Sequence, residues 1–175
     1  LEALKRAGDL KPGWEMPVLM RGQALAKTSR AEALAYFKSF LDQYPQSRDA
    51  RLAYARMLVS DNQLSEASPQ FARLSEEQPE NVEIALAAGL LYLQISRMDE
   101  AEQLLTRAVE LGRGRAGRRD GNIARFYLGQ VMESRKNYDA AMEHYRSITN
   151  GEYFVPAKIR LATLLGRQGK RAEAR

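Results

Sequence analysis

The sequence has 175 residues, of which 45% are hydrophobic and 28% are charged, and its formal net charge is +5. This composition is typical of a globular chain and argues against disorder, and no stretch approaches the roughly 18 consecutive apolar residues of a membrane span. The absence of cysteine excludes disulfides, zinc–thiolate sites and cysteine nucleophiles.

A small residue followed four positions later by a large one recurs along the chain. Ala33, Ala67 and Ala101 are 34 residues apart, and the large residues that follow them are Phe37, Phe71 and Leu105. Ala141 and Tyr145 repeat the pair after six extra residues. Residues at i and i+4 share one face of a helix, so each pair predicts a helix that packs closely against a neighbour.

Other markers keep the same interval. Pro45 and Pro79 are also 34 residues apart, and a proline cannot continue a helix. Upstream of each alanine stands a second small residue, followed three positions later by a large one: Ala55 with Leu58, Gly89 with Tyr92, Gly129 with Met132, and Ala162 with Leu165. The sequence therefore predicts two helices in each repeat.

These markers divide the chain into helix pairs. In order, we predict the second helix of a preceding pair at 1–13, pairs at 14–47, 48–81 and 82–115, a basic insertion at 116–121, a pair at 122–155, and the start of a further pair at 156–175. Because both ends fall inside a pair, we expect the chain to be part of a longer array.

A 34-residue period of two helices with small, aromatic and proline markers resembles the tetratricopeptide repeat. One pair matches that family at Gly89, Tyr92, Ala101 and Ala108, and another at Leu128, Gly129, Tyr138, Ala141 and Tyr145. The family's early tryptophan is missing throughout, and Arg21 stands at the usual small position of the first pair. The resemblance implies an all-α fold, a right-handed solenoid of stacked antiparallel helix pairs.

The resemblance also implies a concave surface that is lined by the first helix of each pair. The residues that this layout places there are Val18, Gly22, Leu25, Leu52, Arg56, Val59, Leu86, Leu90, Leu93, Phe126, Gln130, Glu133, Ile159 and Thr163. Most are apolar, whereas the members of the family that grip a terminal carboxylate carry lysine and asparagine there. We therefore expect a groove for an apolar or amphipathic segment of a protein partner. Packing between repeats, or contacts with the protein's own flanking segments, are the alternatives.

A basic stretch coincides with the insertion and contains Arg113, Arg115, Arg118 and Arg119. It could meet an acidic partner, phosphate groups or a membrane surface. A solvated loop that tolerates insertion is the alternative, and it is the interpretation we favour.

The residues indicate no chemistry of their own. The one histidine, His144, has no second histidine for a metal site or a nucleophile–base pair, so we expect no catalysis, cofactor or metal, and no small-molecule substrate. An RNA-binding helical repeat would need a continuous basic track, which the sequence lacks.

The resemblance thus implies a scaffold or adaptor that binds a protein or peptide within a larger complex. A regulatory repeat region of a larger multidomain protein is the alternative. The sequence is similar in style to the repeat lipoproteins and envelope adaptors of Gram-negative bacteria, which would imply a periplasmic or outer-membrane-anchored location, with the cytoplasm as the alternative. Oligomeric state and partner identity are not predicted.

Overall fold

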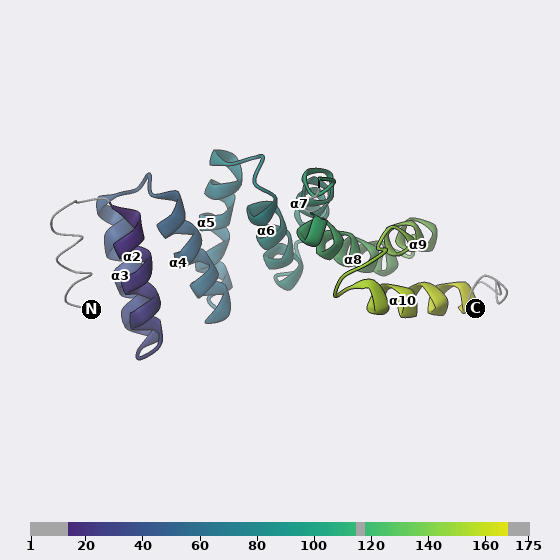
Figure 1. Cartoon of the computed structure of the whole chain (residues 1–175), viewed down its shortest axis with the longest axis horizontal. Coiled ribbons are helices and arrows are strands. Elements are labelled where there is room, and N and C mark those ends of the chain that lie inside the picture. The colour runs from purple at the N-terminus through teal and green to yellow at the C-terminus, as the bar shows by residue number, and fades with distance from the viewer. Residues whose placement is uncertain (1–13, 115–117, 168–175) are drawn as a thin grey trace. The chain divides into compact units, whose positions relative to one another are not determined.

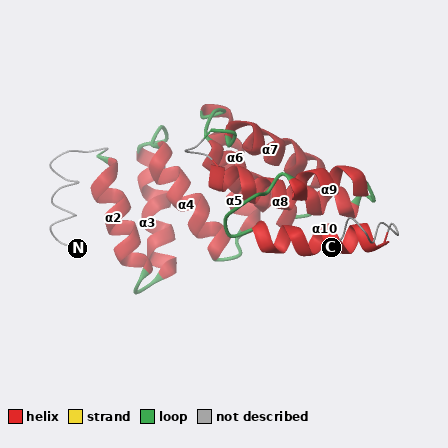
Figure 2. Ribbon diagram, turned by 45° about the vertical axis from the view of Figure 1, so that its right-hand side comes forward, coloured by secondary structure: helices red, strands yellow, loops and turns green. Residues whose placement is uncertain are grey.

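Every regular element of the described residues, 14–114 and 118–167 of a computed structural model, is an α-helix (Figures 1 and 2). The chain forms two compact units that divide between Glu77 and Gln78. The prediction of an all-helical chain is confirmed for the described residues.

The first unit contains two helix pairs. Helix α2 (Glu15–Ala26) pairs with α3 (Arg30–Gln43), and α4 (Arg48–Ser60) pairs with α5 (Leu64–Glu77). Each helix contacts the next one along the chain, and the two first helices, α2 and α4, also contact each other.

The second unit repeats this arrangement. Helix α6 (Val82–Gln94) pairs with α7 (Met98–Leu111), and α8 (Arg118–Ser134) pairs with α9 (Tyr138–Arg146). Helix α10 (Phe154–Arg167) packs against α9 as the first helix of a further pair. Helices α6 and α8 contact each other directly, so the first helices lie side by side.

The same tight turn joins the two helices of three pairs. In each turn one residue has a positive φ, namely Asn62, Ser96 or Lys136, and the next residue donates its N–H to a carbonyl five positions back, at 2.8–2.9 Å. This hydrogen bond satisfies a carbonyl that the helix end would otherwise leave without a partner. Asn137 also caps α9, because its side chain accepts a hydrogen bond from the Ala140 N–H at 3.3 Å.

The residues that define the repeat form the core. The four alanines and the four large residues that follow them are at most 1% exposed: Ala33, Phe37, Ala67, Phe71, Ala101, Leu105, Ala141 and Tyr145. The helices of a pair come so close that a Cβ atom on Gly129 would lie 2.4 Å from Cε1 of Tyr145. The predicted role of the small residues is therefore confirmed.

The register of the first pair differs from our prediction. Gly22, and not Arg21, faces the partner helix, because a Cβ on Gly22 would lie 2.2 Å from Cζ of Phe37. Gly22 precedes Ala33 by eleven residues, whereas the other small residues precede their alanines by twelve. The α2–α3 turn accordingly lacks the positive φ of the other three, and its Ser29 N–H bonds to the Leu25 carbonyl, four positions back, at 2.8 Å.

The insertion is also shorter than predicted. Helix α8 begins at Arg118, so the last four residues of the range 116–121 are helical. Gly112, at the end of α7, and Gly121, near the start of α8, let the two helices lie close together at this point. A Cβ on Gly112 would lie 2.6 Å from the Cα of Gly121.

Candidate partner-binding site

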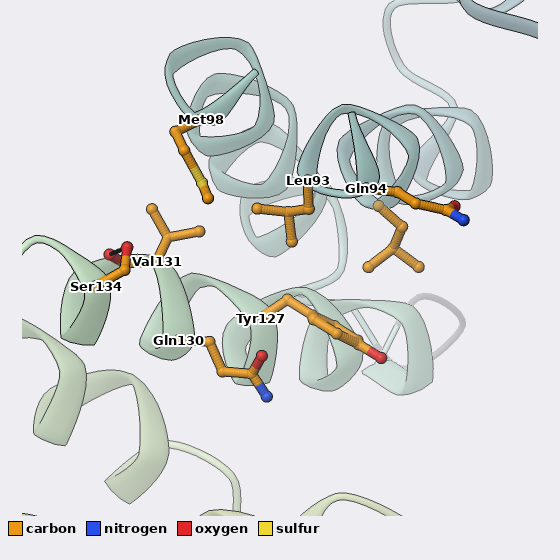
Figure 3. A pocket seen from close by; sticks show the side chains of 8 residues that line it. Leu93, Gln94, Met98, Tyr127, Gln130, Val131 and Ser134 are labelled. Carbon is orange, nitrogen blue, oxygen red and sulfur yellow. Dashed lines mark hydrogen bonds between the residues drawn. The ribbon is translucent and has the colours of Figure 1, made fainter. Parts of the chain in front are cut away.

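A pocket of about 530 Å³ lies within the second unit, on the face built from first helices (Figure 3). We call it the α6–α8 pocket. It is lined by Leu90, Leu93 and Gln94 of α6, Met98 of α7, and Tyr127, Gln130, Val131 and Ser134 of α8.

Helical spacing brings these side chains together. On α8 the lining residues are spaced at i, i+3, i+4 and i+7 from Tyr127, which is one face of a helix. Leu93 and Met98 approach from the other side of the pocket, opposite Val131 and Tyr127 (Figure 3). Gly89 lets α6 pack closely against its partner helix, because a Cβ on Gly89 would lie 2.8 Å from Cγ of Leu105 on α7. The core thus holds the α6 wall of the pocket in place.

The lining is apolar with an uncharged polar rim. Leu90, Leu93, Met98 and Val131 supply aliphatic surface, and the phenol of Tyr127, two glutamine amides and one hydroxyl supply the polar atoms. The Ser134 hydroxyl donates to the Val131 carbonyl at 2.7 Å, which leaves its oxygen available as an acceptor. Such a surface suits an apolar side chain of a bound peptide, while the backbone amides of that peptide form hydrogen bonds with the rim.

Aromatic side chains support the α8 wall from behind. The ring centroids of Tyr127 and Tyr153 are 6.0 Å apart, and those of Phe126 and Tyr153 are 4.9 Å apart. Burial, together with a hydrogen bond to Tyr127, raises the pKa of Tyr153 to about 12. This phenol therefore stays neutral near neutral pH.

Glu133 belongs to a structural network. Its Oε1 accepts a hydrogen bond from the Tyr145 hydroxyl at 2.5 Å and another from Nη1 of Arg160 at 2.9 Å. The Arg160 guanidinium also lies 5.9 Å from the centre of the Phe126 ring. The network ties α8 to α9 and α10, and the Glu133 side chain is only 19% exposed, so its role here is structural.

The structure separates the predicted binding residues into three groups. Leu90, Leu93 and Gln130 line the α6–α8 pocket. Val18, Leu86 and Phe126 are only 4%, 8% and 8% exposed, so they are core residues that offer a partner little surface. The others vary: Leu25, Leu52 and Val59 are half-buried, whereas Arg56, Ile159 and Thr163 are exposed.

The burial of Val18 and Gly22 follows from the register of the first pair. Aligning the pairs on Gly22 moves every position of α2 by one, so Leu19 and Gln23 take the places that we had given to Val18 and Gly22. Consistent with this, Leu19 is half-buried and Gln23 is exposed.

Sequence reasoning missed five of the lining residues: Gln94, Met98, Tyr127, Val131 and Ser134. Gln94 and Ser134 lie four positions after Leu90 and Gln130, both of which were predicted, so helical spacing could have found them. Met98 had no such signal, because it stands on a second helix.

The basic stretch is only partly described. Arg113 and Arg119 are exposed, and Arg119 makes a 3.9 Å ion pair with Glu152 in which both side chains are largely in solvent. Arg118 is the first residue of α8, and Arg115 lies outside the described residues. A function for this stretch stays a prediction.

The first unit contains a second, polar pocket of about 500 Å³ between α3, α4 and α5. Its buried Arg51 donates to Oε1 of Gln70 at 2.7 Å and to the Pro45 carbonyl at 2.5 Å, and Nη2 of Arg73 donates to the same carbonyl at 2.9 Å. These bonds hold the α3–α4 loop, which gives the arginines a structural role.

Metal sites and membrane spans have no candidate in the part of the chain that the structure describes. Within residues 14–114 and 118–167, His, Asp and Glu form no group of three that could hold a metal ion. None of the helices in the same ranges combines the length and the apolar character needed to cross a membrane.

Comparison with known proteins identifies the family. Two models of the tetratricopeptide repeat match residues 24–85 and 58–116, which together span more than half of the chain. The BBSome complex member BBS4 homolog of Drosophila melanogaster is 26% identical over 128 residues, which are 73% of this chain and 25% of that protein. The chain thus spans about a quarter of the curated relative's length.

Solved structures show the same fold. A crystal structure of MamA is 20% identical and has a TM-score of 0.76, with 87% of each chain covered. YrrB, described as a tetratricopeptide-repeat protein with an unusual peptide-binding site, is 19% identical and has a TM-score of 0.78, with 98% of this chain and 87% of that chain covered. At these identities the likeness concerns the fold.

The chain belongs to the tetratricopeptide-repeat family, and its fold class is the all-α tetratricopeptide-repeat solenoid that the sequence predicts. The repeat of this family is a non-catalytic scaffold for interactions with other proteins.

Proposed function

We propose that this chain docks a protein partner through the α6–α8 pocket, which takes an apolar side chain from an extended or helical segment of that partner. The observation that carries this proposal is an uncharged, largely apolar pocket of about 530 Å³ on the first-helix face. The peptide-binding site described for YrrB, which shares the fold, supports the same kind of ligand.

The pocket offers a partner both affinity and orientation. Burying a Leu or Phe side chain contributes about 1.5–3 kcal/mol, and Leu90, Leu93, Met98 and Val131 supply the apolar walls. The amides of Gln94 and Gln130 can each donate and accept, which suits the N–H and C=O groups of a peptide backbone. A pocket of this kind would select a segment by its anchor side chain.

The test is selection from a library of random dodecapeptides displayed on phage, panned on the immobilised protein. The affinities of the most enriched peptides are then measured by fluorescence polarisation for the wild type and for a Leu93→Gln/Met98→Gln double variant. Leu93 is half-buried at the edge of the core and Met98 is 38% exposed, so both substitutions leave the fully buried side chains in place. We expect enrichment of aliphatic or aromatic residues, and affinity about tenfold lower for the variant, the equivalent of about 1.4 kcal/mol.

The matched control is Met20→Gln. Met20 is 51% exposed on α2 and lies outside the pocket, so this variant should bind like the wild type. Circular dichroism and urea unfolding check that all variants are folded. If every enriched peptide binds the double variant as tightly as the wild type, the pocket is not the docking site.

A further inference from the structure

Asn150 is the one asparagine of the sequence that is followed by a glycine. Asn150 and Gly151 lie in the loop between α9 and α10, and both are exposed. Among the described residues, neither the side-chain amide of Asn150 nor the Gly151 N–H has a hydrogen-bond partner. Gly151 has a φ of +86°, and apart from its chain neighbours nothing described lies within 4 Å of an added Cβ. The side-chain amide can therefore approach the next backbone nitrogen without steric hindrance.

The other asparagines are held or hindered. The side chains of Asn81 and Asn137 accept hydrogen bonds from the first N–H groups of α6 and α9. Asn122 is only 8% exposed. Asn62 is exposed in the α4–α5 turn, but a glutamine follows it, and the side chain of that glutamine crowds the nitrogen. Asparagine is a chemically labile residue, and its lability here is concentrated at one position.

We propose that Asn150 is a site of spontaneous deamidation. The deprotonated backbone nitrogen of Gly151 attacks Cγ of Asn150, the new N–C bond closes a succinimide ring, and the side-chain nitrogen leaves as ammonia. Water then opens the ring. Attack at Cγ gives aspartate, whereas attack at the main-chain carbonyl gives isoaspartate, in which the main chain runs through Cβ and Cγ. One water is consumed and one ammonia is released, so the reaction needs no oxidant, reductant or enzyme.

Isoaspartate would lengthen a loop that is fixed at both ends. Ile148, before the site, is fully buried, and Tyr153, after it, packs against Phe126 with ring centroids 4.9 Å apart. Between them the Asn150 carbonyl accepts a hydrogen bond from Nδ2 of Asn122 on α8 at 3.3 Å. The additional backbone atom and the new negative charge displace this carbonyl. We therefore expect the loop to lose its hydrogen bond to α8, and α10 to open locally more often.

The experiment incubates the wild-type protein in a mildly alkaline buffer, which favours the deprotonated nitrogen, and digests it with trypsin. Asn150 falls in the tryptic peptide 147–158 and Asn62 in the peptide 57–73, so mass spectrometry follows both in one sample. Peptide 147–158 should gain the mass difference between an amide and an acid at least about tenfold faster than peptide 57–73. An L-isoaspartyl methyltransferase should label it. The matched control, Asn150→Gln, should do neither, because glutamine cannot form the succinimide.

Hydrogen exchange tests the effect on α10, using isoaspartyl protein separated by ion-exchange chromatography. Its α10 amides should exchange about 2- to 10-fold faster than those of fresh protein, as for the loss of one hydrogen bond, and its α4 amides should be unchanged. Asn150→Asp adds the charge without the extra backbone atom and should lie closer to the wild type.

Two results would overturn the inference, and neither depends on the docking role of the α6–α8 pocket. If peptide 147–158 deamidates no faster than peptide 57–73, Asn150 is not a preferred site. If isoaspartate forms but the α10 amides exchange as in fresh protein, the proposed effect on α10 is refuted.

Discussion

Replacing Gly129 by alanine tests whether helix pairs pack as closely as the repeat requires. Gly129 lies within α8, and the added Cβ would stand 2.4 Å from Cε1 and 2.6 Å from Cζ of Tyr145. The Tyr145 ring has little room to move, because it is fully buried and its hydroxyl is bonded to Glu133 at 2.5 Å. Restoring an ordinary carbon–carbon contact needs a shift of roughly 1 Å or more.

Two opposing effects set the magnitude. Alanine is about 1 kcal/mol more favourable than glycine inside a helix, whereas inserting a methyl group into a well-packed core costs about 1–3 kcal/mol. Because the ring is held at both ends, we expect the upper part of that range to apply and Gly129→Ala to be about 1–2 kcal/mol less stable than the wild type. The melting temperature should fall by about 2–8 °C.

Urea unfolding followed by circular dichroism measures this change, and Gly166→Ala is the matched control. Gly166 is also a helical glycine, but apart from its chain neighbours and its own helix backbone nothing in the described residues lies within 4 Å of an added Cβ, so this variant should gain up to about 1 kcal/mol. If Gly129→Ala is as stable as Gly166→Ala, or more stable than the wild type, the reasoning about close helix contact is refuted.

Three further predictions concern buried polar groups. Arg51→Ala should lower the free energy of unfolding by about 2–4 kcal/mol, because it removes the bonds to Gln70 and to the Pro45 carbonyl and leaves a cavity; urea unfolding measures it. Tyr145→Phe should cost about 1.5 kcal/mol in the same assay, since the hydroxyl donates to a carboxylate. Burial lowers the pKa of His144 below 6.5, so the unfolded chain binds more protons in that range and stability should fall as the pH drops from about 7.5 to about 5.5.

Each of these predictions has a matched control. Arg107→Ala, at an exposed position of α7, and Tyr138→Phe, at a residue that is 36% exposed, should stay within about 0.5 kcal/mol of the wild type. His144→Gln should show a smaller loss of stability at low pH. Equal losses of stability in a variant and its control would contradict the role given to the Arg51 or Tyr145 hydrogen bonds. The same pH dependence of stability with and without His144 would contradict the role given to His144.

The repeat could be predicted from the sequence because its markers are packing requirements. An alanine such as Ala101, with Leu105 one turn later, is needed wherever two helices touch, so spacing alone locates the helix pairs. The register of α2 could not be predicted in this way. Arg21 falls on the regular interval, and only the contact between Gly22 and the Phe37 ring reveals that this pair is one residue shorter.

The candidate site was harder to predict for a physical reason. Leu86 and Leu90 are four positions apart on one helix and chemically identical, yet Leu86 is 8% exposed in the core while Leu90 lines the pocket. Which of two neighbouring apolar residues is covered depends on how closely the next helix approaches, and a single sequence does not contain that distance. Met98 joins the pocket from α7 for the same reason.

A crystal structure of the protein with the most enriched pocket-dependent peptide would test the central claim most directly. We predict an apolar side chain of the peptide between Leu93 and Tyr127, with the peptide backbone hydrogen-bonded to Gln94 or Gln130. A peptide bound to the surface of α7 and α9, with the α6–α8 pocket empty, would contradict it.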